Sequence, residues 1–363
     1  MTKTVQAEVV RSQIERILTA WGMPSDMVAT TADVMVETDL WGVDSHGISM
    51  IMMYEDMLRE GRLKVSERPR VERETAVTAL IDGNAGLGHP VSVMGMKLAV
   101  EKAKAGGIGL VTVRNSHHFG AAGYYSKIAA DQGCVGFVTS TARGVTVVPT
   151  GGTNPVLGTN PISIAAPAKR NRPFLLDMAT STVAVGKVKV YSFYERPLPE
   201  GWVMDGEGKP MRDAAAAFAL LQGSPAGGLT PIGGTRDLGS HKGYGLGVVA
   251  QILAGALTGA SFSPLRNKDQ GAGVPYNIGH FFLAIDPLIF RAEGEFEDDL
   301  DEVIDFLHAQ PAADAAKPVL VAGDPEAATR DKRLVEGIPI PPALWDKVKD
   351  VAERAGVPFL FGL

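Results

Sequence analysis

The sequence predicts an α/β protein whose N- and C-terminal parts are mainly helical. Near the N-terminus, apolar residues such as Val10, Ile14 and Ile17 recur at helical spacing. In the middle of the chain, short runs rich in β-branched residues alternate with helical patterns, and glycines stand at the joints. At about 100 to 200 residues per domain, a chain of 363 residues can form two or three domains. We expect a helical part over 1–70, an α/β part over 71–280, and a C-terminal part over 281–363 that packs back on the first.

Three helices are expected in the first part. The first covers about 5–18, and the second starts near Val28 and runs into the polar segment GVDSHGISM at 42–50. A third follows Gly47, and Gly61 can end it as a C-terminal cap. His46 therefore lies where a helix begins.

The central part alternates strands and helices. A helix is expected around 91–105, and ERPLPEGWVMDGEGKPMRD at 195–213 has the proline and glycine content of a surface loop. Another helix is expected over 243–258, and ALWDKVKDVAERAG near the C-terminus is helix-like. The strand-like runs are TAVTALID (75–82), GIGLVTV (107–113), CVGFVTST (134–141), ISIAAP (162–167), PFLLDMA (173–179) and FFLAID (281–286).

Composition and charge exclude several classes of partner. The 35 basic and 41 acidic residues give a formal net charge of -6 without a basic stripe, so we do not expect nucleic acid. A single cysteine, Cys134, and an N-terminus without a signal-peptide core indicate the cytoplasm. The longest apolar run, 246–260, is shorter than the roughly 20 residues that span a bilayer. We interpret it as a buried helix and expect no membrane segment.

Generic glycine motifs do not identify a dinucleotide site. GYGLGVVA at 243–250 matches the relaxed G-x-G-x-x-A fingerprint, but no strand precedes it, so close helix packing explains its small residues better. GNAGLG at 83–88 has the wrong glycine spacing, and a standard helix after it would have to start through Pro90. No Walker A motif is present.

Five motifs nevertheless occur together in an order that resembles one known family. With PEGWVMDGEGKP and the late GDPE, they are similar to the type II malate/L-lactate dehydrogenases over nearly the whole chain. That family also includes ureidoglycolate, sulfolactate and 2,3-diketogulonate dehydrogenases and cyclic imino-acid reductases. The five motifs are DSHG (44–47), RNSHHFGAAGYY (114–125), GTNPISIAAP (158–167), LDMATS (176–181) and SHKGYGLG (240–247).

The resemblance implies more than the residue patterns do. It implies an NAD(P)-binding fold that is specific to the family and is not a Rossmann fold. It implies NAD or NADP as cofactor, a small-molecule substrate, and a homodimer in which both subunits build the active-site cleft. The expected reaction is hydride transfer between the nicotinamide and a small 2-hydroxy acid or 2-oxo acid, which also needs a protein group that takes or gives a proton.

His46 and His118 are the candidates for that proton. Taken alone, a single histidine is more often structural than catalytic, and Asp44 has an alternative role as a helix-capping carboxylate. By resemblance, His46 is the acid/base and Ser45 its hydrogen-bond relay. His118 lies between a strand and a helix, where α/β enzymes place polar function, and is the second candidate base. The adjacent His117 is interpreted as merely polar.

The resemblance also assigns substrate and cofactor positions. Thr159 lines the substrate pocket, although an Asn-Pro turn is the plainer explanation of its segment. Lys242 can hold phosphate oxygens, or can be a solvated lysine at a helix start. A late turn at 324–326 is a further, weaker match to the cofactor site. The residues expected along the cofactor are Thr141, Asp177, Met178, Ala179, Lys242 and Gly243.

The chain departs from the family pattern at Met50. Many members carry an arginine four residues after the histidine of DSHG, on the same helix face, where it can clamp a substrate carboxylate. With Met50 in that place, we expect another cation to take over the substrate. Arg143 is preferred over Arg114; alternatively, the substrate presents an apolar or hydroxylated group to Met50.

Three alternatives to hydroxy-acid oxidation stay open. The same histidine can protonate a cyclic imino acid of the Δ1-piperideine-2-carboxylate type. A metal-dependent hydrolase can be built around the histidines, although the HH pair lacks the spacing that directs two ligands along one helix face, so we expect no metal. A third alternative, suggested by Met50, is a protein that binds cofactor without turnover.

Overall fold

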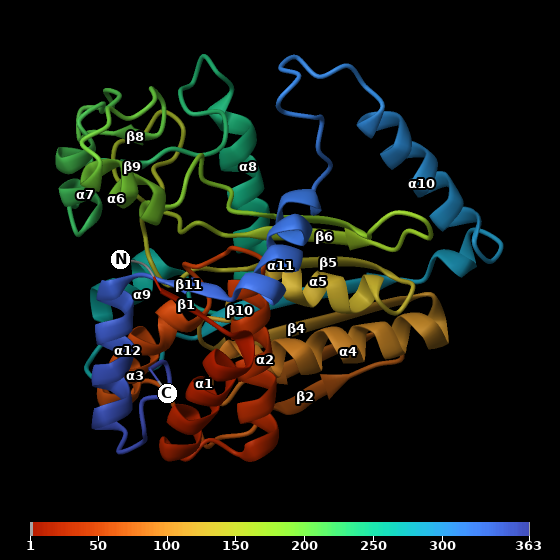
Figure 1. Ribbon diagram of the computed structural model, residues 1–363, viewed down its shortest axis with the longest axis horizontal. Helices are drawn as coiled ribbons and strands as arrows, with labels where there is room; N and C mark the ends of the chain where they lie inside the picture. Colours follow the sequence, from red (N-terminus) through yellow and green to blue (C-terminus); the bar gives the residue numbers. More distant parts are fainter. Residues whose placement is uncertain (1–2, 363) are drawn as a thin grey trace.

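A seven-stranded sheet forms the centre of the computed structural model, which describes residues 3–362 (Figure 1). Its strand order is β2-β3-β4-β10-β5-β6-β7; β3 and β4 are parallel, and the other neighbours are antiparallel. The expected late strand is confirmed as β10, which lies between β4 and β5. The strands are β2 (Arg70–Glu74), β3 (Thr78–Asp82), β4 (Ile108–Ser116), β5 (Val135–Ser140), β6 (Ile162–Ala166), β7 (Phe174–Met178) and β10 (Ile278–Ile285).

Helices cover both faces of this sheet. Helices α4 (Gly88–Gly106) and α5 (Ala122–Ala130) pack on one face, where Tyr125 and Phe282 are fully buried. The other face holds α8 (Ser240–Gln251) and the π-helix η2 (Ile252–Ala256), with η2 so close to β10 that a Cβ on Gly279 would lie 1.9 Å from the Ala254 carbonyl oxygen. Phe282 points the other way, because a Cβ on Gly95 of α4 would lie 2.9 Å from its ring.

The two ends of the chain meet in a second core. Its helices are α1 (Ala7–Ala20), α2 (Ser25–Leu40), the 3-10 helix η1 (Ile48–Met50), α3 (Ile51–Arg59) and α12 (Pro342–Arg354). Strand β1 (Lys3–Val5) pairs antiparallel with β11 (Ile338–Ile340). Apolar side chains from both ends, including Ile14, Met35, Ile51 and Val351, are buried together. The three helices expected before residue 60 are therefore confirmed, with a short 3-10 turn at the start of the third.

A smaller lobe projects from the sheet and contains two helices that the sequence analysis missed. They are α6 (Val185–Phe193) and α7 (Ala214–Leu221), beside the short strands β8 (Val203–Met204) and β9 (Gly228–Leu229). Asp213 caps α7 by accepting hydrogen bonds from two backbone N–H groups. The expected surface loop at 195–213 is mostly irregular but includes β8, whose Val203 is buried in the core of the lobe.

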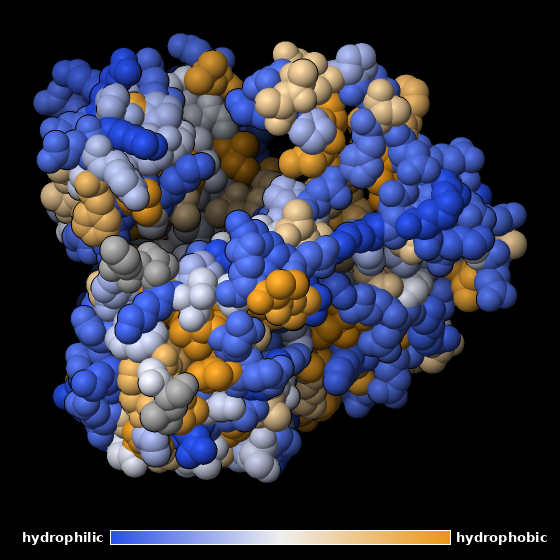
Figure 2. All heavy atoms as spheres, in the orientation of Figure 1, coloured by the Kyte–Doolittle hydropathy of each residue, from blue (hydrophilic) through white to orange (hydrophobic). Residues whose placement is uncertain are grey.

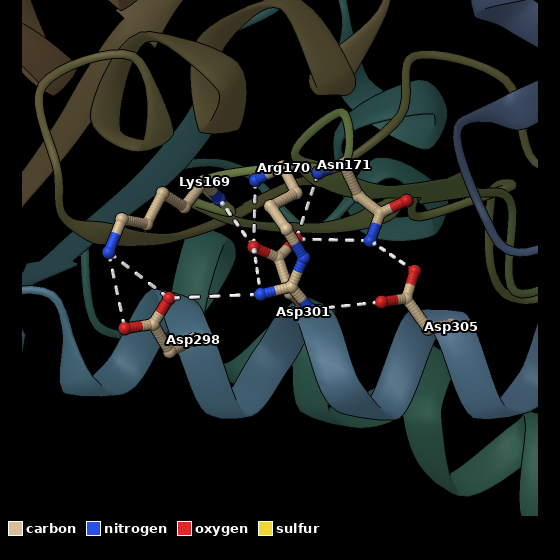
Figure 3. A network of polar contacts seen from close by, with 6 residues as sticks. All are labelled: Lys169, Arg170, Asn171, Asp298, Asp301 and Asp305. Carbon is tan, nitrogen blue, oxygen red and sulfur yellow. Dashed lines mark hydrogen bonds and ion pairs between the residues drawn. The ribbon is translucent and has the colours of Figure 1, made fainter.

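The turn between β6 and β7 is held by a polar network with α10 (Glu295–His308), shown in Figure 3. The buried carboxylate of Asp301 accepts hydrogen bonds from the backbone N–H groups of residues 169–171, at 2.7–3.2 Å. Around it, Lys169 pairs with Asp298 and Arg170 pairs with Asp305. The remaining elements are α9 (Ser263–Asp269), the 3-10 helix η3 (Pro287–Ile289) and α11 (Asp324–Glu336).

The apolar run 246–260 differs from the prediction. It forms α8 and η2 as a helix, but one side is open in the single chain: Ile252 is 53% exposed and Leu257 is 58% exposed. The prediction of a buried helix was wrong for this side, because an apolar sequence does not distinguish a core from an uncovered face. Among residues 3–362, no helix combines the length and apolarity needed to cross a membrane.

Candidate active site

Six of the predicted site residues line one cavity of about 200 Å³. Its walls come from the start of α3, the loop after β4, the segment after β5, and the turn before β6. A second cavity of about 230 Å³, near Thr150 and Arg236 in the small lobe, contains none of them. The six residues are His46, Met50, His118, Thr141, Arg143 and Thr159.

The turn that carries His46 is built around a buried carboxylate on the preceding helix. Asp39 of α2 accepts a hydrogen bond from the backbone N–H of Ile48 at 2.8 Å. Glycine is required at position 47, because a Cβ there would lie 1.9 Å from Asp39 Oδ1. Desolvation is the main reason that the pKa of Asp39 is raised to about 8. The turn before η1 and α3 is thus held by its contacts with Asp39.

Asp44 does not cap this helix, as the alternative interpretation proposed. Its carboxylate forms an ion pair with Arg333 of α11 and accepts its hydrogen bonds from that guanidinium. The backbone carbonyl of Asp44 instead accepts a hydrogen bond from Ser49 Oγ at 2.5 Å. The capping role belongs to Asp39, and Asp44 ties the turn to a helix almost 300 residues later in the chain.

His46 is paired with its neighbour Ser45 and faces His118. The Ser45 hydroxyl lies 2.7 Å from His46 Nδ1, and the centroids of the two imidazole rings are 5.3 Å apart. Burial lowers the pKa of His46 below the ordinary histidine value, because it disfavours the charged ring. The neutral imidazole that results can accept a proton.

His118 is held from the side that faces the protein core. Its Nδ1 lies 2.8 Å from the hydroxyl of Tyr54 and 3.4 Å from the backbone N–H of Gly120. Desolvation, followed by the proximity of His46, lowers the pKa of His118 well below its ordinary value. Two histidines with lowered pKa therefore share the cavity.

The other nearby histidines serve packing. His117 is fully buried and donates from Nε2 to the Arg62 carbonyl oxygen at 3.0 Å, and desolvation is the main cause that lowers its pKa to about 4. His280 bridges Ser116 and Ser140 and stacks on a phenylalanine. Within the part of the chain that the structure describes, no three His, Cys, Asp or Glu side chains are grouped as metal ligands.

The cavity wall includes the cation Arg143 and an apolar side. The guanidinium of Arg143 lies 5.5 Å from the ring centroid of Tyr276, and none of the carboxylates described in the structure forms an ion pair with it. Arg114, the other candidate cation, is paired with Glu72 at 2.7 Å and does not line the cavity. Met50 contributes to the apolar side of the wall.

The residues expected along the cofactor lie mostly outside this cavity. Thr141 lines it and binds the backbone of Gly279. Asp177, in β7, accepts a hydrogen bond from Gly123 N–H at 2.7 Å. Met178 and Ala179 follow it, half-buried, at the end of the strand.

Lys242 and Gly243 belong to the first turn of α8, where Lys242 is exposed. A Cβ on Gly243 would lie 2.3 Å from the backbone nitrogen of Ile232. GYGLGVVA lies inside α8, so the prediction of a helix is confirmed. Close packing holds for Gly247 and Ala250, but a Cβ on Gly245 would meet no atom within 4 Å. The argument from Pro90 was wrong: α4 begins at Gly88, and proline is tolerated in a first helical turn.

Sequence reasoning missed four residues that shape the site: Asp39, Tyr54, His89 and Arg333. Asp39 and Tyr54 occupy helices, where they fit the expected pattern and carry no motif. His89 stands just before the predicted apolar helix at 91–105, and a histidine at this place was the one signal in the sequence. Arg333 lies in α11, far from the turn in the sequence, and the two come together only in the folded chain.

Comparisons with known proteins find relatives over nearly the whole chain. A family model described as malate/L-lactate dehydrogenase matches residues 5–349. Malate dehydrogenase from Pyrococcus horikoshii is 39% identical over 347 residues, which cover 95% of this chain and 94% of that protein. The crystal structure of malate dehydrogenase from Entamoeba histolytica superposes with a TM-score of 0.93 at 33% identity, covering 99% of both chains.

A reductase is also among the similar structures. The Δ1-piperideine-2-carboxylate reductase from Pseudomonas syringae pvar. tomato has a TM-score of 0.82 and 29% identity, covering 97% of this chain and 100% of that chain. The match of the family model across most of the chain and the shared full-length fold lead to one assignment. The chain belongs to the malate/L-lactate dehydrogenase family.

Proposed function

We propose that this chain oxidises a small 2-hydroxy acid to the 2-oxo acid, and catalyses the reverse reduction, with NAD or NADP. Its similar proteins include malate, L-sulfolactate and L-lactate dehydrogenases, which are oxidoreductases that act on CH–OH groups. The observation that carries the proposal is one cavity in which His46 and His118 face each other and Arg143 stands free of carboxylate partners among the described residues. Such a cavity can exchange a proton and hold an anionic substrate.

The residues near the cavity fit a nicotinamide cofactor. Asn160, next to Thr159, has a buried Oδ1 with no hydrogen-bond partner among the described residues, an acceptor that a carboxamide could satisfy. Lys242 is exposed and can meet a phosphate. We propose that the cofactor is held by Thr141, Asp177, Met178, Ala179, Lys242 and Gly243. When bound, the nicotinamide accepts or returns the hydride.

The side chains of the site bind the substrate and transfer its proton. Arg143 binds the substrate carboxylate, and Thr159 lines the substrate pocket beside it. In oxidation, His46 accepts the hydroxyl proton while the hydride leaves C2, which gives the 2-oxo acid and a protonated His46. Ser45 lies at Nδ1 and can accept a hydrogen bond from the imidazolium. In reduction, the same proton returns to the substrate oxygen.

The lowered pKa of His46 sets the expected direction of the pH dependence. Oxidation needs the neutral ring. As pH decreases, kcat/KM for oxidation should therefore begin to fall only below the ordinary histidine pKa. Reduction needs the protonated ring and should become faster as pH decreases. Opposite pH trends for the two directions are the expected signature of one acid/base.

The test of the proposal is His46→Ala. Turnover should fall by about 10²–10⁴-fold, the usual contribution of a general acid/base, while cofactor affinity measured by fluorescence titration stays within a few-fold. Unchanged turnover would refute the assignment of His46. Arg143→Lys complements this test, because lysine keeps the charge but loses the planar fork, so KM for the acid should rise.

Cyclic imino-acid reduction is the second candidate function. The similarity to the Pseudomonas syringae reductase supports it, and Met50 stands where an arginine would otherwise clamp the carboxylate of a simple 2-oxo acid. A panel of lactate, malate, pyruvate, oxaloacetate and a cyclic imine, run separately with the NAD and NADP pairs, distinguishes the two functions. Turnover of the imine alone would replace the first proposal.

We also propose a cytoplasmic homodimer in which α8 and η2 face a second copy. Leu246, Val249, Ile252 and Leu257 leave an apolar side of these helices exposed. Figure 2 shows the surface hollowed between the lobe of α6 and α7 and the elements α10 and α11, with hydrophobic residues in the hollow. In this proposal, 71–280 binds the cofactor and 1–70 carries His46. Of the part 281–363, β11 and α12 pack on 1–70, whereas residues 281–285 belong to β10 of the central sheet. Light scattering on the purified chain should give twice the 38.3 kDa mass.

A further inference from the structure

Two buried residues stand behind His118 and have no part in the function proposed above. Tyr54 of α3 is fully buried, and its hydroxyl lies 2.8 Å from His118 Nδ1. On its other side, the same hydroxyl lies 3.5 Å from Nε2 of His89, which is also fully buried. The rings of Tyr54 and His89 meet edge to face, with centroids 5.6 Å apart. The Tyr54 hydroxyl thus links the buried His89 to His118, which lines the cavity.

The donors around His118 determine which ring nitrogen carries the proton. The backbone N–H of Gly120 points at Nδ1 and can only donate. Nδ1 must therefore be the acceptor nitrogen, and the Tyr54 hydroxyl also donates to it. In a neutral ring, the proton then sits on Nε2. No described residue forms a hydrogen bond with this nitrogen, and His118 lines the cavity.

Tyr54 is suited to remain a donor. Desolvation raises the pKa of its phenol further above the ordinary value, so it stays protonated throughout the working range of pH. His89 can donate from Nε2 to the Tyr54 oxygen, which directs the phenol proton toward His118. The other charged or titratable groups near His118 are His46, Arg143 and His280, and none of them offers a carboxylate that would favour a charged ring.

We propose that Tyr54, supported by His89, keeps His118 neutral with its proton on Nε2, so that His118 donates a hydrogen bond to the substrate oxygen while His46 alone exchanges the proton. This inference rests on the proposed function and refines it. Tyr54 and His89 are positioning residues, because they act through His118 and do not line the cavity.

The division of roles keeps the reaction balanced. In reduction, hydride arrives at the carbonyl carbon and negative charge develops on the oxygen. His118 stabilises this charge through its N–H without giving up the proton, and His46 supplies the proton that completes the hydroxyl group. A fixed donor at a developing oxyanion is worth about 10²–10³ in rate. With ring centroids 5.3 Å apart, both histidines can reach the same substrate oxygen.

Replacement of His118 separates a donor from a base. The amide of His118→Gln can donate a hydrogen bond but cannot act as a base near neutral pH, whereas His118→Ala can do neither. We expect His118→Ala to lower kcat by about 10²–10³-fold, and His118→Gln to stay within about tenfold of wild type with the acidic limb of its pH profile intact. Equal losses in both variants, or disappearance of the acidic limb in His118→Gln, would overturn the proposal.

Tyr54→Phe tests the positioning role. Loss of one hydrogen bond should lower kcat by about tenfold with little change in KM, because the bond matters most in the transition state. Tyr124→Phe is the matched control: it removes the hydroxyl that binds Asp33, away from the cavity, and should leave kcat unchanged. Equal kcat for Tyr54→Phe and wild type would contradict the role of Tyr54.

A spectroscopic measurement makes the inference independent of turnover. With 15N-labelled histidine, the ring-nitrogen shifts report which nitrogen is protonated, and the seven histidines keep the spectrum simple. His118, assigned by its loss in His118→Gln, should be protonated on Nε2 in wild type and should lose this preference in Tyr54→Phe. Protonation on Nδ1 in wild type would refute the inference even if His46→Ala behaves as proposed. Conversely, normal turnover in His46→Ala would refute the proposed function and leave the tautomer result standing.

Discussion

Replacing Gly47 with alanine should dislodge His46 by adding a single methyl group. A Cβ at position 47 would lie 1.9 Å from Oδ1 and 2.1 Å from Cγ of Asp39. Non-bonded heavy atoms prefer about 3.5–4.0 Å, so either the carboxyl group or the turn must move by roughly 1.5 Å. Asp39 is buried and holds Ile48 N–H at 2.8 Å, so either movement breaks this hydrogen bond.

The cost follows from these contacts. A buried N–H that loses its acceptor costs about 1–3 kcal/mol, and forcing an extra carbon into a packed site costs about 1–3 kcal/mol. Together these give about 2–6 kcal/mol, which at roughly 2 °C per kcal/mol corresponds to a fall in Tm of about 4–12 °C. His46 is the adjacent residue, and a displacement of about 1 Å can cost about 10²-fold in turnover.

Thermal denaturation and steady-state kinetics on four variants, Gly47→Ala, Asp39→Ala, the double variant and a control, test this reasoning. The double variant Gly47→Ala/Asp39→Ala makes room for the methyl group, so its loss of stability should be smaller than the sum of the single losses by about 1–3 kcal/mol. Gly186→Ala is the control, because its added Cβ meets no atom within 4 Å at an exposed position of α6. A Gly47→Ala protein with wild-type Tm and kcat, or strictly additive losses, would show that the contact with Asp39 does not hold the turn.

Three further perturbations have definite expected outcomes. Met50→Arg places a guanidinium on the cavity wall, four residues after His46, and should lower KM for simple 2-oxo acids by about tenfold in steady-state assays, the effect of one charge-assisted hydrogen bond; an unchanged KM would show that the substrate does not reach this wall. Asp39→Asn removes a carboxyl group whose pKa is raised to about 8, so wild type should lose stability relative to this variant as pH rises from about 4 to 8, when Tm is measured against pH. For Asp301, burial opposes ionisation, but hydrogen bonds from residues 169–171 outweigh it and lower the pKa to about 2. The stability advantage of wild type over Asp301→Ala should therefore be present above about pH 4 and disappear as pH falls toward 2.

The sequence identified the residues of the cavity better than the contacts that hold them. His46, His118 and Thr159 are far apart in the chain, and the ordered motifs placed all three in one family site; the structure brings them to one cavity. Nothing in the spacing of these motifs gives the distance between the imidazole rings. That distance depends on α3 and the loop after β4 packing together, which requires the whole sheet.

Tyr54 and Asp39 illustrate why the supporting residues were missed. Tyr54 occupies an apolar position of a helical pattern, and its hydroxyl acquires a role only when the loop after β4 lies beside α3. Asp39 occupies the last turn of α2, where an acidic residue is ordinarily solvated. The fold buries it instead, and Gly47 leaves the space for it. Local patterns cannot report such contacts, because both partners are ordinary in their own segments.

The apolar helix face shows a different reason for failure. The prediction of a helix over 243–258 was correct in type, since α8 and η2 occupy 240–256. Its environment was wrong, because residues such as Ile252 and Leu257 are exposed in the single chain. Burial against another copy of the chain and burial in a core select the same apolar side chains, so hydropathy alone does not separate them.

The contacts around the DSHG turn also explain how position 50 can differ from the family pattern without displacing His46. Asp44 is tied to Arg333, Ser45 lies at His46 Nδ1, and Gly47 makes room for Asp39. Each of the three residues flanking His46 is thus fixed by a specific partner. Met50 makes no side-chain hydrogen bond and lies on the cavity wall, one turn beyond this framework. Substitutions there can change the cavity wall without moving His46. Under the proposed function, the reaction and the choice of substrate are therefore encoded by different residues of the same short segment.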